Sequence, residues 1–163
     1  MEIRPETAAD VPAVQALTEA AFAPMSFSDG KEVEALAGLR CDGDLQLSLV
    51  AEEGGEIIGH VAFSPVSLDG AVCNWIALGP IAVKRARQRQ GVGSALVAAG
   101  AAAFKAQKAL GLVLIGNPKV YRSMGFVSDG AMHYRDVPAD IVQFLPFSDE
   151  RPSGLLAFAP ALE

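Results

Sequence analysis

A basic loop joins an apolar strand to a helix in the segment Gly79-Pro80-Ile81-Ala82-Val83-Lys84-Arg85-Ala86-Arg87-Gln88-Arg89-Gln90-Gly91-Val92-Gly93-Ser94. Gly91 and Gly93 leave out side chains at positions where a ligand has to approach the backbone. The backbone N–H groups that open a helix have no partner inside it, and the helix end attracts an anion by roughly 0.3–1 kcal/mol. Counter-charge comes from four basic residues, Lys84, Arg85, Arg87 and Arg89. The segment therefore predicts a site for a pyrophosphate.

Other interpretations of this segment fit less well. A P-loop requires lysine and then serine or threonine after its last glycine, whereas Ser94-Ala95 follow Gly93. The dinucleotide-binding fingerprint requires a third glycine where Leu96 stands. Two alternatives stay open from the local chemistry: a helix that begins with glycines under a solvated basic loop, and a nucleic-acid contact by residues 84–89.

The residues on either side of this segment predict a mixed α/β sheet. Strands are expected at residues 2–4, 45–51, 57–68 and 71–83, with hairpin turns at Gly54-Gly55 and Asp69-Gly70. One helix is expected after Thr7, which has Asp10 three residues on in a capping-box position. A second helix is expected to start at Ser28 or Asp29.

The pattern changes after the basic loop. A helix over residues 91–108 leads to the short apolar strand 112–115, which is typical of a parallel strand buried on both faces. Asn117 can cap a short helix that Gly125 ends, and two more strands are expected near Phe126 and at 155–158. We expect a mostly antiparallel sheet of six to seven strands with a central β-α-β crossover and flanking helices.

Length and composition limit the class of protein. The chain has 163 residues, of which 51% are apolar, so we expect a single domain over residues 1–163. The net charge of −6 argues against general binding of nucleic acid. No apolar run approaches the roughly 20 residues of a membrane helix, and the first residues lack the apolar region of a signal peptide. Cys41 and Cys73 lack metal-ligand spacing, and we expect reduced thiols, a cytoplasmic protein and no metal.

Gln88-Arg89-Gln90-Gly91-Val92-Gly93 resembles the Q/R-x-x-G-x-G/A signature of the GNAT superfamily of N-acetyltransferases. The segments 59–66 and 116–126 are similar to one bacterial branch of predicted acetyltransferases, and the order of elements is similar too. The resemblance thus covers nearly the whole chain. Relatives often have proline where this chain has Arg85. That difference concerns the stiffness of the loop.

The resemblance implies acetyl-CoA as the donor of an acetyl group. The loop residues that would hold it are Gln88, Arg89, Gln90, Gly91, Val92, Gly93 and Ser94, with the pyrophosphate on their backbone and Gln88 orienting the loop. The pantetheine arm would pair like an extra strand with the backbone of Ile81 and Val83, passing Ala82. Pro80 cannot donate a ladder hydrogen bond, which predicts a bulge or a splay of the sheet here. Asn117 would contact the pantetheine or only cap its helix.

Acetyl transfer to a primary amine needs a donor for the oxyanion and an acid for the thiolate. The backbone N–H near Ile81 is the candidate oxyanion donor. Tyr121 stands where the family places a tyrosine that acts as the general acid, and its phenol can protonate a thiolate. The alternative for Tyr121 is a purely structural residue of the interior.

The general base and the acceptor are harder to identify. The strand 71–83 contains no Asp or Glu, so His60 is the candidate base, with a structural histidine as the alternative. Asp29 and Glu32 could bind a cationic amine or cap a helix. Phe27 and Trp75 could line the acceptor pocket or pack in the core.

The resemblance thus implies an N-acetyltransferase that acts on a small-molecule or peptide amine. The alternative of another class is a non-catalytic acyl-CoA-binding sensor or subunit, which the weak assignment of a base keeps open. Dimers are common among similar proteins, so a homodimer is compatible with this chain.

Overall fold

An eight-stranded sheet runs through the residues that this computed structural model describes, 1–25 and 28–163. The strands are β1 (Glu2–Pro5), β2 (Leu47–Glu53), β3 (Glu56–Leu68), β4 (Ala71–Val83), β5 (Gly111–Ile115), β6 (Met132–His133), β7 (Val142–Pro146) and β8 (Gly154–Phe158). Their order is β1-β2-β3-β4-β5-β7, and β8 pairs with β3 and β6. Two pairs are parallel, β4 with β5 and β6 with β8. The predicted mixed, mostly antiparallel sheet is confirmed, with one strand more than expected.

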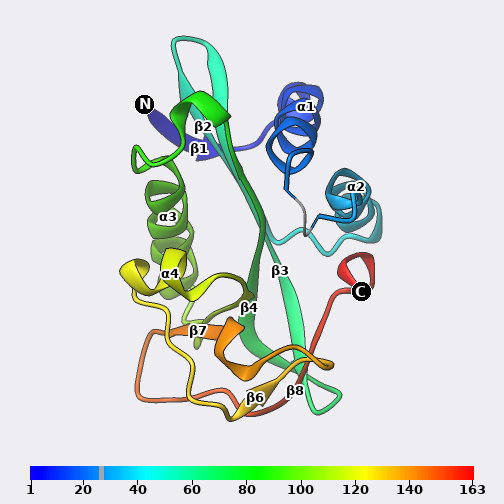
Figure 1. Ribbon diagram of the computed structural model, residues 1–163, viewed down its shortest axis with the longest axis vertical. Coiled ribbons are helices and arrows are strands. Elements are labelled where there is room, and N and C mark those ends of the chain that lie inside the picture. Colours follow the sequence, from blue (N-terminus) through cyan, green and yellow to red (C-terminus); the bar gives the residue numbers. More distant parts are fainter. Residues whose placement is uncertain (26–27) are drawn as a thin grey trace.

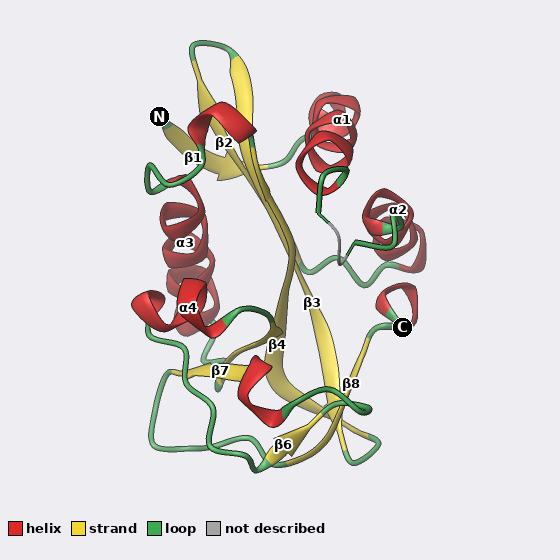
Figure 2. Ribbon diagram, viewed as in Figure 1, coloured by secondary structure: helices red, strands yellow, loops and turns green. Residues whose placement is uncertain are grey.

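Helices cover both faces of this sheet (Figures 1 and 2). The helices are α1 (Val11–Phe22), α2 (Glu32–Asp42), α3 (Val92–Ala106) and α4 (Pro118–Tyr121). Short 3₁₀ turns are η1 (Ala8–Asp10), η2 (Arg85–Arg87), η3 (Arg122–Met124), η4 (Ala139–Ile141) and η5 (Pro160–Leu162). α1 and α2 lie on one side of the sheet, and α3 and α4 lie on the other. In the described part of the chain, no helix combines the length and the apolar character needed to cross a membrane.

Tight hairpins build the centre of the sheet. The β3–β4 turn has both central residues in the left-handed region, with φ of 51° at Asp69 and 80° at Gly70. This geometry matches the twist of the flanking strands, and Asp-Gly is a favoured sequence for it. β4 begins and ends at the predicted residues, and β3 begins one residue early.

Apolar side chains fill the space on both sides of the sheet. Phe63 on β3 is fully buried and meets Phe104 of α3 with ring centroids 5.3 Å apart. On the opposite side, Val50 and Ala62 of the sheet pack with Leu36 of α2. β2 and β3 are therefore buried on both faces.

Three expectations need correction. The second helix begins at Glu32, because Ser28 and Asp29 accept hydrogen bonds from the backbone N–H groups two residues on and form turns instead. β2 begins at Leu47 and excludes Leu45. Near Phe126 there is only an isolated bridge from Val127 to Phe144, since the partner strand is β7, which we did not predict.

Candidate functional site

β4 and β5 separate after a short parallel contact. The paired residues are Trp75 with Gly111, Ile76 with Leu112 and Ala77 with Val113. Beyond Ala77, β4 continues to Val83 along β3, whereas β5 continues to Ile115 along β7. Within the described ranges, residues 78–83 of β4 have no strand partner on the β5 side. The sheet thus opens here and leaves a free strand edge.

A bulge lies at the point where the strands separate. Val61 of β3 pairs with Ile81, and Phe63 pairs with Leu78, so the single residue Ala62 faces two residues of β4. Those two residues are Gly79 and Pro80, as the sequence predicted. A bulge bends its strand and re-aims the neighbouring backbone groups. The half-buried Ile81 is the first paired residue after it.

The loop after β4 turns its backbone into the start of α3. Arg89 and Gly91 have φ of 63° and 87°, and α3 begins at Val92. The Gln88 side chain donates a hydrogen bond to the Val83 carbonyl at 3.1 Å, which ties the loop to the end of β4. Ala95 is the first residue of the helix to donate back along it, to Gly91 at 3.0 Å. The N–H groups of residues 92–94 are therefore left for an external acceptor.

Close packing holds this helix start against the sheet. A side-chain carbon added at Gly59 of β3 would lie 2.8 Å from Val92 Cγ1 and 3.0 Å from Leu96 Cδ1. Glycine at position 59 thus allows the first turn of α3 to lie directly on β3. The open N–H groups are fixed relative to the free edge of β4.

Two of the four basic residues of the loop, which we expected to provide counter-charge for an anion, form ion pairs within the protein instead. Lys84 forms an ion pair with Glu56, and Arg87 forms one with Glu53, both across to the β2–β3 hairpin. The hydrogen bond from Arg87 lowers the pKa of Glu53. These contacts anchor the loop, so counter-charge for an anion is left to Arg85 and Arg89, which form no ion pair with the described residues.

Tyr121 lies at the end of α4, beside the end of β5. Its ring packs on Gly116, where an added side-chain carbon would be 2.6 Å from Tyr121 Cε2. Phe126 meets the ring edge-on, with centroids 5.8 Å apart and the planes at 73°. Burial raises the pKa of Tyr121 above its ordinary value of 10.0, which keeps the phenol protonated at neutral pH. Its hydroxyl forms no hydrogen bond with any described residue.

Asn117 caps the helix that carries Tyr121. Its Oδ1 accepts a hydrogen bond from the Lys119 backbone N–H at 2.9 Å, and Pro118 occupies the first helical position. The predicted cap is confirmed. The Asn117 side chain is exposed, so its nitrogen stays available to a ligand.

His60 lies in the interior, on the face of β3 that α1 and α2 cover. It is 0% exposed, and its Nε2 is 2.7 Å from Ser48 Oγ. Burial, and to a lesser degree the charge of Arg40, lower the pKa of His60 to about 4. The ring is therefore neutral at physiological pH. An enclosed neutral imidazole fits the structural alternative better than direct contact with an acceptor.

The candidate acceptor residues divide between a pocket and the core. Asp29 and Glu32 line a pocket of about 560 Å³ that reaches Pro80 of the bulge. Trp75 is 3% exposed and packs edge-on against Phe144, with centroids 6.0 Å apart, so it belongs to the core. Phe27 lies outside the described residues.

Some lining residues were missed by the sequence interpretation. The C-terminal segment also lines the pocket at Pro80, through Pro160, Ala161, Leu162 and Glu163. No local pattern marks these residues, because they reach the site only through the pairing of β8 with β3. Gln143 was missed because β7 was not predicted.

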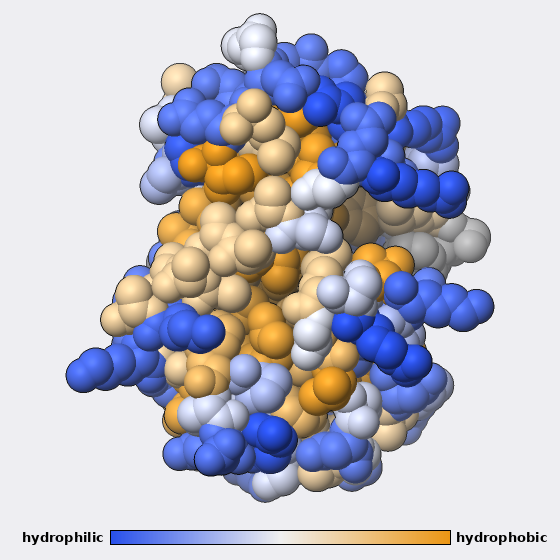
Figure 3. Space-filling model, turned by 90° about the vertical axis from the view of Figure 1, so that its left-hand side faces the viewer, coloured by the Kyte–Doolittle hydropathy of each residue, from blue (hydrophilic) through white to orange (hydrophobic). Residues whose placement is uncertain are grey.

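An apolar groove lies on the other side of the open edge, between α3 and η3. It has a volume of about 400 Å³, and its lining residues are Ser94, Val97, Ala98, Ala101, Ala102, Lys105, Ser123, Met124 and Leu145. Figure 3 shows an apolar band across this face of the molecule, with charged side chains above and below it. In the described residues, no group of three or more His, Cys, Asp or Glu is placed to hold a metal ion.

Known proteins share both the sequence and this architecture. Residues 44–128 match the acetyltransferase (GNAT) domain family. The uncharacterized N-acetyltransferase YhbS of Escherichia coli (strain K12) is 35% identical over 127 residues, which are 77% of this chain and 73% of YhbS.

Two solved structures are similar over nearly the whole chain. A GNAT family acetyltransferase from Brucella melitensis in complex with acetyl-CoA has a TM-score of 0.88 and 39% identity, over 99% of this chain and 97% of its own. YhbS from Escherichia coli in complex with CoA has a TM-score of 0.90 and 28% identity, over 99% and 91% of the two chains. The open strand edge, the glycine loop and these likenesses together show that this chain belongs to the GNAT family of N-acetyltransferases.

Proposed function

We propose that this protein transfers an acetyl group from acetyl-CoA to a primary amine by direct attack in a ternary complex. The observation that carries the proposal is the free edge of β4, which leads directly into the open N–H groups at the start of α3. One extended ligand with a pyrophosphate at its middle fits both features. The similar structures that hold acetyl-CoA and CoA support the choice of donor.

The donor is held mainly by backbone groups. Its pyrophosphate accepts hydrogen bonds from the N–H groups of residues 92–94, with Arg89 as counter-charge and Gln88 orienting the loop. Its pantetheine arm pairs with Ile81 and Val83 on the free edge of β4.

The reaction then needs one hydrogen-bond donor for the oxyanion and one general acid near the thioester. The Ile81 N–H stabilises the oxyanion that forms when the amine attacks the carbonyl carbon. As the carbon–nitrogen bond forms and the carbon–sulfur bond breaks, the Tyr121 phenol gives its proton to the departing thiolate. The proton of the amine leaves to solvent, since no carboxylate stands on β4. The raised pKa of Tyr121 supports this role, because the acid form is the one present.

The acceptor binds in the pocket that reaches Pro80. Asp29 and Glu32 bring negative charge to its wall, which favours an amine that carries a positive charge elsewhere in the molecule. The acceptor is a small molecule or the end of a peptide.

A screen of amines tests the proposal. Purified protein is incubated with acetyl-CoA and single amines, namely polyamines, amino acids, aminoglycosides and short peptides with a free N-terminus, and release of the CoA thiol is followed. We expect at least one amine to raise release well above the rate with acetyl-CoA alone, and mass spectrometry to show the acetylated amine. Tight binding of acetyl-CoA without turnover of any amine would instead favour a non-catalytic acyl-CoA sensor.

A further inference from the structure

Gln143 is a buried amide in the middle of β7. It is 2% exposed and lies on the wall of a pocket whose lining includes Arg122, Phe126 and Ser128. Burial of an amide is unfavourable unless its polar atoms form hydrogen bonds. Gln143 Nε2 donates to the carbonyl oxygen of Gly116 at 2.9 Å. A leucine or methionine here would fill the space without the desolvation of a polar group, so the amide is present for its hydrogen bond.

Gly116 joins β5 to α4, and both its backbone groups are held by the segment 141–143, where η4 ends and β7 begins. Its N–H donates to the Ile141 carbonyl at 3.1 Å, and its carbonyl accepts from Gln143. The Tyr121 ring lies directly against it: an added side-chain carbon would be 2.6 Å from Cε2 and 3.1 Å from Cδ2. A shift of Gly116 by a fraction of an ångström would therefore move the ring.

β7 also holds the far end of the segment that carries Tyr121. Val127 and Phe144 exchange two backbone hydrogen bonds, each of 2.9 Å. Phe126, next to Val127, donates to the Tyr121 carbonyl at 3.2 Å and packs on the ring. Of these contacts, only the hydrogen bond of Gln143 is made by a side chain to the backbone beneath the ring. It is the contact that a substitution can remove while the backbone ladder stays intact.

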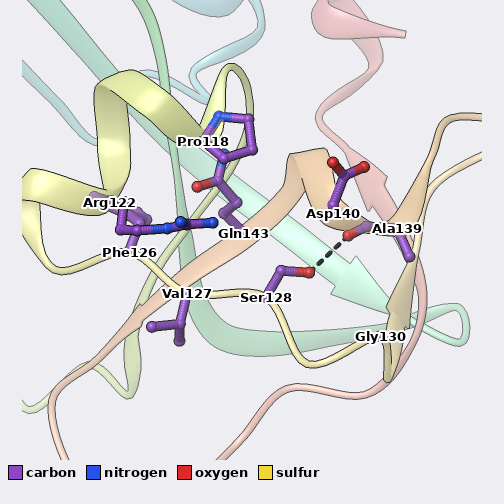
Figure 4. A pocket seen from close by; sticks show the side chains of 9 residues that line it. All are labelled: Pro118, Arg122, Phe126, Val127, Ser128, Gly130, Ala139, Asp140 and Gln143. Carbon is purple, nitrogen blue, oxygen red and sulfur yellow. Dashed lines mark hydrogen bonds between the residues drawn. The ribbon is translucent and has the colours of Figure 1, made fainter.

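We propose that Gln143 is a positioning residue that sets the place of the Tyr121 phenol through the carbonyl of Gly116. The inference rests on the proposed role of Tyr121 as the acid. Figure 4 shows the Gln143 side chain between Pro118 and Arg122, on the wall of a pocket of about 270 Å³. Gln143 lines neither the apolar groove along α3 nor the pocket that reaches Pro80.

Titration of the tyrosine tests this link without any knowledge of the acceptor. The chain has two tyrosines, and Tyr134→Phe leaves Tyr121 as the sole phenol. In that background the absorbance of the tyrosinate should rise with a midpoint, the pKa of Tyr121, above 10. Gln143→Met should lower this pKa toward 10, because a displaced ring is better hydrated. The exposed Gln107→Met serves as the matched control and should leave the titration unchanged. An unchanged titration in Gln143→Met would overturn the proposal.

Kinetics with the best amine from the screen give the second measurement. We expect Gln143→Met to lower kcat about 10- to 100-fold with little change in KM for acetyl-CoA, since misplacement of a reacting group costs rate rather than donor affinity. In Gln143→Glu only the protonated carboxyl can donate to Gly116, so kcat of this variant should be recovered at low pH. A loss of thermal stability with the titration and kcat unchanged would make Gln143 purely structural.

Gly116→Ala keeps the test decisive if the Gln143 variants do not fold. The added methyl group meets the Tyr121 ring directly and should shift the same titration downward, and no shift would contradict the link through Gly116. The fate of the acid role is separate. If Tyr121→Phe left kcat unchanged, Tyr121 would not be the acid, while the titrations would still show whether Gln143 places its ring.

Discussion

Burial moves the pKa values of Tyr121 and His60 in opposite directions. For each residue it disfavours the charged form, so the phenol pKa rises and the imidazole pKa falls to about 4. Both side chains are therefore neutral at physiological pH. The protonated phenol of Tyr121 lies beside the end of β5, whereas the His60 ring is fully buried, with its Nε2 beside Ser48 Oγ.

Replacement of the Tyr121 phenol tests its role as the acid. We expect Tyr121→Phe to lower kcat by about 10²- to 10⁴-fold, because general acid catalysis contributes on that order. KM for acetyl-CoA should change little, since the ring still packs on Gly116 and Phe126. Steady-state kinetics check this, with Tyr134→Phe as the control at the other tyrosine. Unaltered turnover would remove Tyr121 from the mechanism.

The lowered pKa of His60 predicts how stability depends on pH. Because the folded protein binds this proton only below about pH 4, whereas the unfolded chain binds it below 6.5, the unfolded state gains protons first as the pH falls. Stability is thus lost between these values, by about 2 kcal/mol from pH 7 to pH 5. Urea unfolding at both pH values should show a smaller difference in His60→Gln. Equal pH dependence in the two proteins would mean that His60 is not buried as a neutral ring.

At the scale of an element, α3 connects the proposed donor site to the core. Its first turn lies on Gly59 of β3, and its middle lies on Phe63, where glycine stands at position 100. The loop before it is anchored to the β2–β3 hairpin by the ion pairs of Lys84 and Arg87. Under the proposed function, donor binding depends on the packing of α3 against the sheet.

A negative charge introduced at the start of α3 should weaken donor binding without lowering the stability of the fold. Ser94 is exposed in the first turn, where an acidic side chain is favourable for a helix. Ser94→Glu should therefore leave the melting temperature unchanged or slightly raised, while its carboxylate repels the pyrophosphate. We expect calorimetry to show at least about tenfold weaker binding of acetyl-CoA, equal to 1.4 kcal/mol. The neutral Ser94→Gln is the matched control, and equal affinity of both variants would contradict the phosphate site.

The contact of α3 with the sheet is tested at Gly100. A side-chain carbon added there would lie 2.1 Å from Phe63 Cζ, and Phe63 is fully buried. We expect Gly100→Ala to destabilise the protein by about 1–3 kcal/mol, although alanine is the better helix former. Chemical denaturation measures this. The double variant Gly100→Ala with Phe63→Leu should lose less unfolding free energy than the two single variants lose together, because the smaller leucine leaves space for the added methyl group.

At the scale of the whole molecule, the proposed donor site is spread over elements that fold together. In the proposal β4, the loop, α3 and α4 each contribute, and the sheet between α1–α2 and α3–α4 holds them in place. The unfolded chain has no such arrangement. Any ligand that needs all of these parts binds the folded state alone.

Acetyl-CoA should therefore stabilise the whole fold. At a concentration of 100 times Kd the gain is about 2.7 kcal/mol, and the melting temperature should rise with the logarithm of the concentration. Thermal unfolding with increasing acetyl-CoA measures this, and Ser94→Glu should need higher concentrations for the same shift. A melting temperature that does not respond to acetyl-CoA would argue against the proposed donor.

Much of the fold could be predicted because its signals are local. Asp69-Gly70 allows the β3–β4 turn, Pro80 forces the bulge, and Asn117 caps α4, each through the conformational preferences of one or two residues. The 112–115 strand was recognisable from its apolar run. β7 was missed, because its residues become a strand only by pairing with β5.

The sequence alone allowed prediction of the glycine loop, of the strand before it and of the order of the elements. These features were sufficient to identify the family. The partners of Lys84 and Arg87, the enclosure of His60 and the contact of Gln143 with Gly116 could not be predicted in this way. Backbone preferences act between neighbours in sequence, whereas burial and charge pairing depend on which distant segments meet in space. The glycine loop and the helix that follows it were therefore predictable, and the surroundings that set pKa values and hold Tyr121 emerged only from the folded molecule.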